Sequence, residues 1–222
     1  MTKALDFTSG YDSRRPPMLG HNAVATSQPL AAQAGMKMLQ LGGNAVDAAI
    51  ATAMALTVVE PTGNGIGSDA FAIVWDGEKL HGLNASGRSP ASWHADLFAG
   101  KSAVPEIGWD AVTVPGAVSG WVALAERFGT LPLTTLAQPA IDYARNGFPV
   151  SPLIGHLWQR GYSKLKDQPG FSACFAPEGR APRVGEIFRN PAQANSLELI
   201  AKTNGDAFYR GELAQKIAAF AK

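Results

Sequence analysis

The chain has 222 residues, 46% of them hydrophobic, and a formal net charge of +1. This composition is typical of a globular protein with one large domain or two small ones. The lysines and arginines are scattered, and a near-neutral charge balance gives no electrostatic case for a nucleic-acid partner. Cys174 is the single cysteine, so an intrachain disulfide is excluded. We interpret Cys174 as a small packing residue rather than a catalytic thiol.

Residues 1–20 are polar and rich in arginine and proline, which predicts an irregular N-terminal arm. This stretch lacks the apolar segment of a secretory signal. The longest apolar run, residues 45–59, is too short to span a bilayer. We therefore expect a cytoplasmic protein without a membrane partner, or a periplasmic one if a leader has been removed.

The first predicted elements are a strand and a helix. Residues 21–26 (His-Asn-Ala-Val-Ala-Thr) are a short strand candidate. Apolar residues then recur at helical spacing from a proline that suits a first turn, which predicts a helix over 29–41. Gly42-Gly43 follows as a C-cap signal.

A second helix is predicted over 45–59. Asn44 is a good N-cap, and Asp47 falls near the positive end of the helix. Apolar residues occupy almost every face of this segment, which is typical of a helix sandwiched inside a domain. If the chain were separated from the rest of a larger fold, we would expect this helix to be the exposed apolar face and to cause self-association.

A glycine-rich loop with Gly63, Gly65 and Gly67 follows this helix. Such density suggests close backbone approach or positive φ, and a position near a site. Residues 70–75 and 79–84 read as two strands joined by an Asp-Gly turn. Strands packed under a buried helix predict an α/β layered domain.

The remainder of the chain is predicted to be largely helical. Residues 88–115 have no regular pattern and contain three prolines. Helices are expected near 116–128, over 133–137 continuing into 139–145 with Pro139 in a first turn, and over 151–165, 192–203 and 211–221, with a loop-rich stretch at 171–190.

Several kinds of chemistry are disfavoured by the sequence. The run 65–70 matches a loose dinucleotide fingerprint, but it follows a helix and precedes a strand, the reverse of what pyrophosphate binding needs. The four histidines show no metal-ligand spacing, and His94 with Asp96 reads as a surface pair. Thr134-Thr135 reads as helix-cap residues rather than a nucleophile. No cofactor or metal is expected.

The residues after the second strand form a candidate anion-binding corner. Asn84, Ser86 and Arg88 lie in a run of small polar residues, 84–90. A guanidinium can bind a carboxylate with two hydrogen bonds, which suits recognition of an amino-acid carboxylate. A turn with a surface arginine explains the same residues equally well.

Motifs along residues 20–222 together resemble the γ-glutamyltranspeptidase family (gamma-glutamyltransferase, or glutathione hydrolase) of N-terminal-nucleophile hydrolases. They occur in the family's order: Gly42-Gly43-Asn44-Ala45-Val46-Asp47-Ala48-Ala49, Val58-Val59-Glu60-Pro61, Gly65-Ile66-Gly67 with Phe71 beyond it, Val114-Pro115-Gly116, Arg127-Phe128-Gly129-Thr130-Leu131-Pro132, Pro139-Ala140-Ile141, Gly147-Phe148-Pro149-Val150-Ser151 and Asp206-Ala207-Phe208-Tyr209-Arg210-Gly211.

The resemblance implies an αββα layered fold of the α+β kind, of which this chain is a part. Residues 21–222 are similar to the N-terminal part of the large subunit, with a layered segment over about 21–115 and a helical segment over about 116–222. It also implies autoproteolysis of a precursor into large and small subunits. A threonine at the new N-terminus of the small subunit would be the nucleophile, with its own amino group as base. The substrates implied are γ-glutamyl amides such as glutathione.

Two departures from the family pattern bear on function. The nucleophile motif, two threonines followed by histidine, does not occur here, so we expect no catalytic nucleophile in this chain and a partner, the small subunit or remaining C-terminal part, that carries it. In addition, Ser86 aligns with the arginine that holds the substrate α-carboxylate in γ-glutamyl enzymes, and Arg88 lies two positions later.

We therefore expect Arg88, Ser86 and Asn84 to be substrate-binding residues of a γ-glutamyl amidohydrolase. Two alternatives stay open. One is an amidohydrolase of the same fold that resembles glutaryl-cephalosporin acylases, and the other is a truncated, non-catalytic helical interaction module. The glycine loop is expected to shape the core near the site, with Ser68-Asp69 as its unusual feature.

Overall fold

A computed structural model of the protein describes residues 20–221, so all but the last residue of the predicted N-terminal arm, 1–20, lies outside the described residues. The main helices are α1 (Pro29–Gln40), α2 (Ala45–Val59), α3 (Ala117–Phe128), α4 (Leu133–Asn146), α5 (Pro152–Leu165), α7 (Pro191–Lys202) and α9 (Glu212–Phe220). Short helices are α6 (Phe171–Phe175) and α8 (Asp206–Tyr209), with 3₁₀ turns η1 (Ala95–Phe98) and η2 (Trp109–Ala111). The strands are β1 (Ala70–Trp75), β2 (Leu80–Ala85), β3 (Phe148–Pro149) and β4 (Ile187–Phe188).

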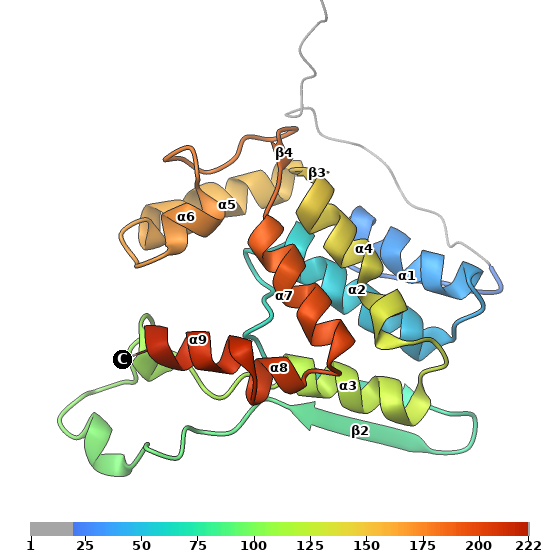
Figure 1. The fold of residues 1–222 in the computed structure, drawn as a ribbon, viewed down its shortest axis with the longest axis horizontal. Coiled ribbons are helices and arrows are strands. Elements are labelled where there is room, and N and C mark those ends of the chain that lie inside the picture. The colour runs from blue at the N-terminus through green and yellow to red at the C-terminus, as the bar shows by residue number, and fades with distance from the viewer. Residues whose placement is uncertain (1–19, 222) are drawn as a thin grey trace, which may run out of the picture.

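Helices α1, α2, α4 and α7 pack against one another in that order, with α2 near the centre (Figure 1). The apolar sequence of α2 fits this position, because ten of its residues are buried. Gly35 lets α1 approach closely: a Cβ at this position would lie 2.3 Å from Thr52 Oγ1. Most of α2 is therefore covered by other helices of the same chain, contrary to the expectation that it would be the exposed apolar face. Ala45 and Ala49 are the residues of α2 that stay exposed.

The N-terminus of α2 is closed by a capping box. Asn44 Oδ1 accepts hydrogen bonds from the N–H groups of Val46 (2.9 Å) and Asp47 (3.1 Å), and the Asp47 carboxylate accepts from Asn44 N (2.9 Å). The Asn44 amide also donates to the carbonyl of Phe128 (2.6 Å). The predicted N-cap is confirmed, and it reaches across to the end of α3.

Asp47 joins two turns that are more than eighty residues apart in the chain. Its side chain is fully buried and accepts hydrogen bonds from Thr130 N (3.0 Å), Thr130 Oγ1 (2.6 Å) and Leu131 N (3.3 Å) as well as from Asn44. Burial raises the pKa of this carboxyl, but the donated hydrogen bonds outweigh burial and hold the pKa below its ordinary value. The Asp47 carboxylate thus links the α1–α2 turn to the α3–α4 turn, beside the Asn44–Phe128 hydrogen bond.

Helix α4 runs without interruption through Pro139, which the sequence placed in a first turn. Proline removes one backbone hydrogen bond from a helix interior. The apolar face of α4 compensates, because Leu136, Ala137, Ala140 and Ala144 are fully buried against the neighbouring helices. The N-cap position is Pro132, so Thr134 and Thr135 lie inside the first turn and neither is the cap.

Strands β1 and β2 form an antiparallel hairpin that lies along α3 (Figure 1). The predicted strands are confirmed, with Phe71 opposite Asn84 and Trp75 opposite Leu80. At the turn, His81 contacts Asp76 Oδ2 (2.7 Å) and Arg127 of α3 (3.0 Å). Hydrogen bonds from backbone N–H groups of the turn and from His81 lower the pKa of the Asp76 carboxyl.

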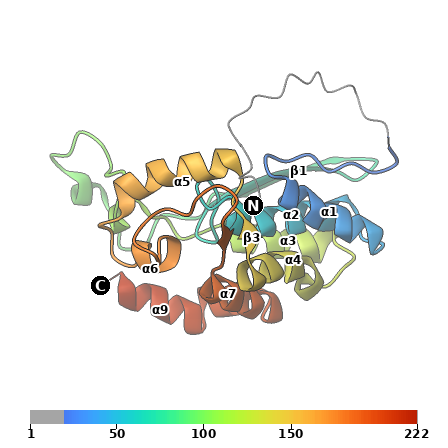
Figure 2. The same ribbon diagram turned by 90° about the horizontal axis from the view of Figure 1, so that it is seen from above.

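One face of this hairpin is uncovered by the described residues. Helices pack on its other side, and the hairpin lies at the margin of the molecule in Figure 2. The uncovered face carries four highly exposed large apolar side chains, with Ile73 78% exposed and Phe71, Trp75 and Leu80 each more than 60% exposed. Of the expected αββα layers, residues 20–221 contain the β1–β2 sheet and the helices on one side of it, and a second small sheet is formed by β3 and β4, which fits a mixed α+β protein.

Residues 21–26 do not form the predicted strand. This segment borders a cavity beside α1 and α2, and Val24 packs near Gly35. A strand needs a hydrogen-bonding neighbour, and no strand of residues 20–221 pairs with this segment.

The C-terminal half adds a subassembly around Trp158 of α5. Strands β3 and β4 pair antiparallel, and the Trp158 ring lies 4.7 Å from that of Phe188, centroid to centroid. Helices α8 and α9 follow α7 and run back past α3 (Figure 1). One hydrophobic core extends from α1 to α8 and shows no boundary near residue 115. The division into a layered segment and a helical segment at that point stays a sequence prediction. Within residues 20–221, no helix has the length and apolar character needed to cross a membrane.

We predict that Asp47→Asn lowers the free energy of unfolding by about 2–4 kcal/mol, because a carboxylate that accepts several hydrogen bonds in a buried site is replaced by an amide with a donor facing them. Urea unfolding followed by circular dichroism measures this change. Glu126→Gln is the matched control, since Glu126 is exposed on α3, and it should change stability by less than about 0.5 kcal/mol.

The effect of Asp47→Asn should also depend on pH. The folded-state pKa of Asp47 lies below the unfolded value of 3.8, so its stabilisation is complete above that value and is lost as pH falls through the folded-state pKa. The difference between the two proteins should be constant near neutral pH and should narrow in acid. A difference that is independent of pH would contradict this assignment.

Candidate functional site

The glycine loop differs from its predicted form. Gly65 and Gly67 have no left-handed φ, and a Cβ added at Gly67 would meet nothing within 4 Å. A Cβ at Gly65 would come no closer than 3.4 Å to another atom, Ser68 Oγ. Within residues 20–221, neither a crowded backbone nor a left-handed φ requires glycine at positions 65 and 67. The two glycines therefore do not shape the core as we expected.

The crowded glycines lie instead where the end of β2 meets the start of α3. Gly87 has φ +83°, and a Cβ there would lie 1.9 Å from the carbonyl oxygen of Val114. A Cβ at Gly116 would lie 1.9 Å from the carbonyl oxygen of Ala85. Only glycine permits this backbone approach. The Val-Pro-Gly motif at 114–116 thus has a physical role that the sequence did not reveal.

The end of the glycine loop contacts the same junction between β2 and α3. The Ser68 carbonyl accepts hydrogen bonds from Gly116 N (3.1 Å) and Ala117 N (3.0 Å), which satisfies free N–H groups at the start of α3. The Tyr209 hydroxyl donates to the Pro115 carbonyl (2.7 Å) and accepts from Ser119 N (2.9 Å). We call this junction the β2–α3 corner: residues 68, 84–88 and 114–119, braced by Tyr209.

The three predicted substrate-binding residues all belong to the β2–α3 corner. Asn84 is exposed and lies on the uncovered face of the hairpin opposite Phe71, and its Oδ1 accepts from Ser86 N (3.0 Å) to shape the turn. Ser86 is half-buried, with its hydroxyl 3.4 Å from the Gly87 carbonyl. Asn84 therefore stabilises the turn at the corner, in addition to any contact with substrate.

Arg88 is the one cation among these residues. Its backbone carbonyl accepts from Val114 N (2.9 Å), which fixes the main chain, while its side chain is exposed. Within residues 20–221, no carboxylate oxygen lies within 4.0 Å of its guanidinium. A guanidinium on a rigid turn and without an internal partner can bind an external carboxylate.

Other polar groups give weaker candidates. His94 and Asp96 form a long, exposed contact of 3.9 Å, as the surface-pair interpretation expects. Cys174 is exposed on α6, so it is not the packing residue we expected. The described part of the chain contains no group of three side chains from histidine, cysteine, aspartate and glutamate that could hold a metal.

Comparison with known proteins places this fold and corner in one family. The γ-glutamyltranspeptidase family model matches residues 31–222. A solved cephalosporin acylase from Bacillus halodurans is 50% identical, with a TM-score of 0.83 over 96% of this chain and 43% of its own.

Two curated relatives are also close in sequence. The glutathione hydrolase-like YwrD proenzyme of Bacillus subtilis is 42% identical over 87% of this chain and 38% of its own length. The oxamate amidohydrolase proenzyme of Klebsiella pneumoniae is 37% identical over 89% of this chain and 39% of its own.

The fold is therefore part of an N-terminal-nucleophile hydrolase fold. The chain belongs to the γ-glutamyltranspeptidase family, because the family model covers most of its length. It spans about two fifths of the length of these curated relatives. Both are named proenzymes, which supports a partner subunit in the family assembly.

We predict that Gly116→Ala disrupts the β2–α3 corner and destabilises the protein by more than about 2 kcal/mol, because its Cβ would overlap backbone that cannot move independently. Gly67→Ala, the matched control, should change stability by less than about 0.5 kcal/mol. Thermal unfolding of both variants measures the difference. Equal stabilities for the two variants would contradict the close approach between residues 85 and 116.

Proposed function

We propose that the protein carrying this chain is an amidohydrolase of the γ-glutamyltranspeptidase family that acts on amides whose acyl group bears a carboxylate. The β2–α3 corner supplies the carboxylate-binding residue, Arg88. A threonine in the remaining part of the protein, outside this chain, attacks the amide carbonyl with its own amino group as base, releases the amine, and passes the acyl group to water or to an acceptor amine.

The observation that carries this proposal is the exposed Arg88 guanidinium beside a rigid turn. Its main chain is held on both sides, at Arg88 by Val114 and at Gly87 by the contact that glycine alone permits. The planar guanidinium fork matches a carboxylate, so little freedom is lost for each hydrogen bond that it forms. Ser86 and Asn84 lie on the same turn and offer a hydroxyl and an amide to the polar part of the acyl group.

The relatives fit this substrate class. The names of two relatives refer to glutathione and to oxamate, and both compounds are amides whose acyl portion carries a carboxylate. The third relative is a cephalosporin acylase. A carboxylate on the acyl group is therefore a recognition feature that γ-glutamyl and glutaryl substrates would share.

The residue at position 86 bears on which of two acyl groups, γ-glutamyl or glutaryl, the protein accepts. A γ-glutamyl substrate presents an α-carboxylate and an α-ammonium, whereas a glutaryl substrate presents a carboxylate alone. Serine at position 86 in place of the family's arginine leaves a single guanidinium at the corner. The second candidate substrate is therefore an amide whose acyl group has one carboxylate and no α-amino group. The 50% identity to the cephalosporin acylase supports this candidate.

The uncovered face of the β1–β2 hairpin is the proposed contact surface for the remaining part of the protein. Phe71, Ile73, Trp75 and Leu80 form an apolar face that no element within residues 20–221 covers, and contiguous exposed apolar faces mark interaction sites. Asn84 continues this face toward Arg88. A subunit packed on the hairpin would therefore reach the β2–α3 corner, where its nucleophile is needed.

We predict that Arg88→Ala in the full-length gene product lowers kcat/KM by about 10- to 100-fold for γ-glutamyl or glutaryl p-nitroanilide, because a charge-assisted pair to the substrate carboxylate is lost. Arg183→Ala is the matched control, since Arg183 is exposed and distant in sequence from the corner. Release of p-nitroaniline measures the rates.

The same assay separates the possible substrates. The ratio of kcat/KM for the two anilides assigns the acyl group, and residues 1–222 alone should be inactive because the nucleophile is proposed to lie elsewhere. Unchanged kcat/KM in Arg88→Ala for every accepted substrate would overturn the role of Arg88. Absence of any amidase activity in the full-length product would favour a non-catalytic interaction module.

A further inference from the structure

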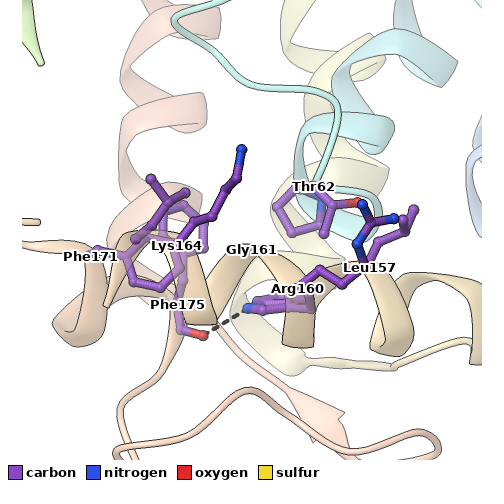
Figure 3. A pocket seen from close by; sticks show the side chains of 10 residues that line it. Thr62, Leu157, Arg160, Gly161, Lys164, Phe171 and Phe175 are labelled. Carbon is purple, nitrogen blue, oxygen red and sulfur yellow. Dashed lines mark hydrogen bonds between the residues drawn. The ribbon is translucent and has the colours of Figure 1, made fainter. Parts of the chain in front are cut away.

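A second cavity lies on the side of the molecule formed by α5 and α6. Its volume is about 480 Å³, within the range of small-molecule sites. Figure 3 shows Phe171 and Phe175 of α6 beside Lys164, with Arg160 farther along α5 near Thr62. None of these residues belongs to the β2–α3 corner, so this cleft is a separate feature of the chain.

The cleft has an apolar floor with fixed rings. Trp158 is 2% exposed, and its indole N–H donates to the Phe175 carbonyl (3.0 Å), which holds the ring and the end of α6 together. The Phe171 and Phe175 rings lie 5.5 Å apart, centroid to centroid. Leu157 and Leu165 complete the apolar lining from α5. A flat aromatic molecule would bury its faces against such a surface.

The rim of the same cleft is cationic. Arg160 and Lys164 are four residues apart on α5, so they project from the same side of the helix and repel each other. Both are exposed, and within the described residues neither lies within 4.0 Å of a carboxylate oxygen. An anion between them would relieve this repulsion and bind through charge-assisted hydrogen bonds.

Gly161 keeps the cleft open between the two cations. It lines the cavity, and a Cβ added there would meet nothing within 4 Å, so packing does not demand glycine at this position. Glycine in a helix interior costs about 1 kcal/mol relative to alanine. The open space at Gly161, between two cations and above aromatic rings, leaves room for a ligand with an apolar body and a negative charge.

We propose that this cleft binds a small aromatic carboxylate, with the ring on the aromatic floor and the carboxylate between Arg160 and Lys164. The aromatic lining selects the flat apolar body of the ligand, and the two cations select its charge. The complete protein therefore has a second carboxylate-binding site, independent of Arg88.

The test measures binding of 1-naphthoate to the full-length protein by isothermal titration and saturation-transfer NMR, beside the uncharged 1-naphthalenemethanol. A fragment of this size should bind with a Kd in roughly the millimolar range. The alcohol should bind at least ~5-fold more weakly, because it lacks the charge that Arg160 and Lys164 recognise. Gly161→Leu should weaken naphthoate binding at least ~10-fold by filling the cleft.

Two further variants locate the site. Arg160→Gln with Lys164→Gln should reduce the preference for naphthoate over the alcohol to within about 2-fold, because the charges are gone. The control pair, Lys166→Gln with Arg183→Gln, removes two exposed cations outside the cleft and should leave the preference intact. Circular dichroism confirms that each variant is folded.

The proposal is overturned if naphthoate shows no saturable binding, if naphthoate and the alcohol bind equally, or if Gly161→Leu, folded, binds naphthoate as the parent does. Loss of naphthoate binding in Arg88→Ala would place the ligand at the β2–α3 corner and would also overturn it. Retained naphthoate binding in a protein with no amidase activity would reject the proposed enzyme function and leave this site standing.

Discussion

The carboxylate of Asp47 holds together two turns on which the rest of this structure depends. It is fully buried and accepts hydrogen bonds from Asn44, at the start of α2, and from Thr130 and Leu131, between α3 and α4. A buried charge is tolerated only when its oxygens are paired, and the donors here supply that pairing. Because α2 lies among the other helices of the core and α3 carries the hairpin, this carboxylate, together with the Asn44–Phe128 hydrogen bond, helps to fix the helical layer relative to the sheet.

The candidate site follows from that placement. Once α3 is fixed, its N-terminus meets the Ser68 carbonyl and the end of β2, where Gly87 and Gly116 permit contact between backbones. The turn that carries Arg88 is thereby rigid while the Arg88 side chain stays exposed. The apolar hairpin face next to it gives a surface on which the remaining part of a family member can pack, so recognition and assembly share one corner.

Local patterns predicted most helices and the hairpin well, because capping residues, helical periodicity and the Asp-Gly turn act within a few residues. They failed where the outcome depends on distant partners. Residues 21–26 lack a pairing strand, burial of α4 carries that helix through Pro139, and α2 is covered by the chain itself. The corner residues Asn84, Ser86 and Arg88 could be named from the sequence. The need for glycine at 87 and 116 could not, since it arises from contact between segments about thirty residues apart.

The most direct test of this account is a double-mutant cycle between Asp47 and Thr130. Their side chains share the shortest hydrogen bond of the Asp47 site, 2.6 Å from Thr130 Oγ1 to Asp47 Oδ2. Unfolding free energies of Asp47→Asn, Thr130→Val and the double variant should give a coupling energy of about 1 kcal/mol or more, as expected for residues in one hydrogen-bond network. Additivity of the two changes within about 0.3 kcal/mol would contradict the account, because the shortest hydrogen bond between the two turns would then contribute nothing to stability.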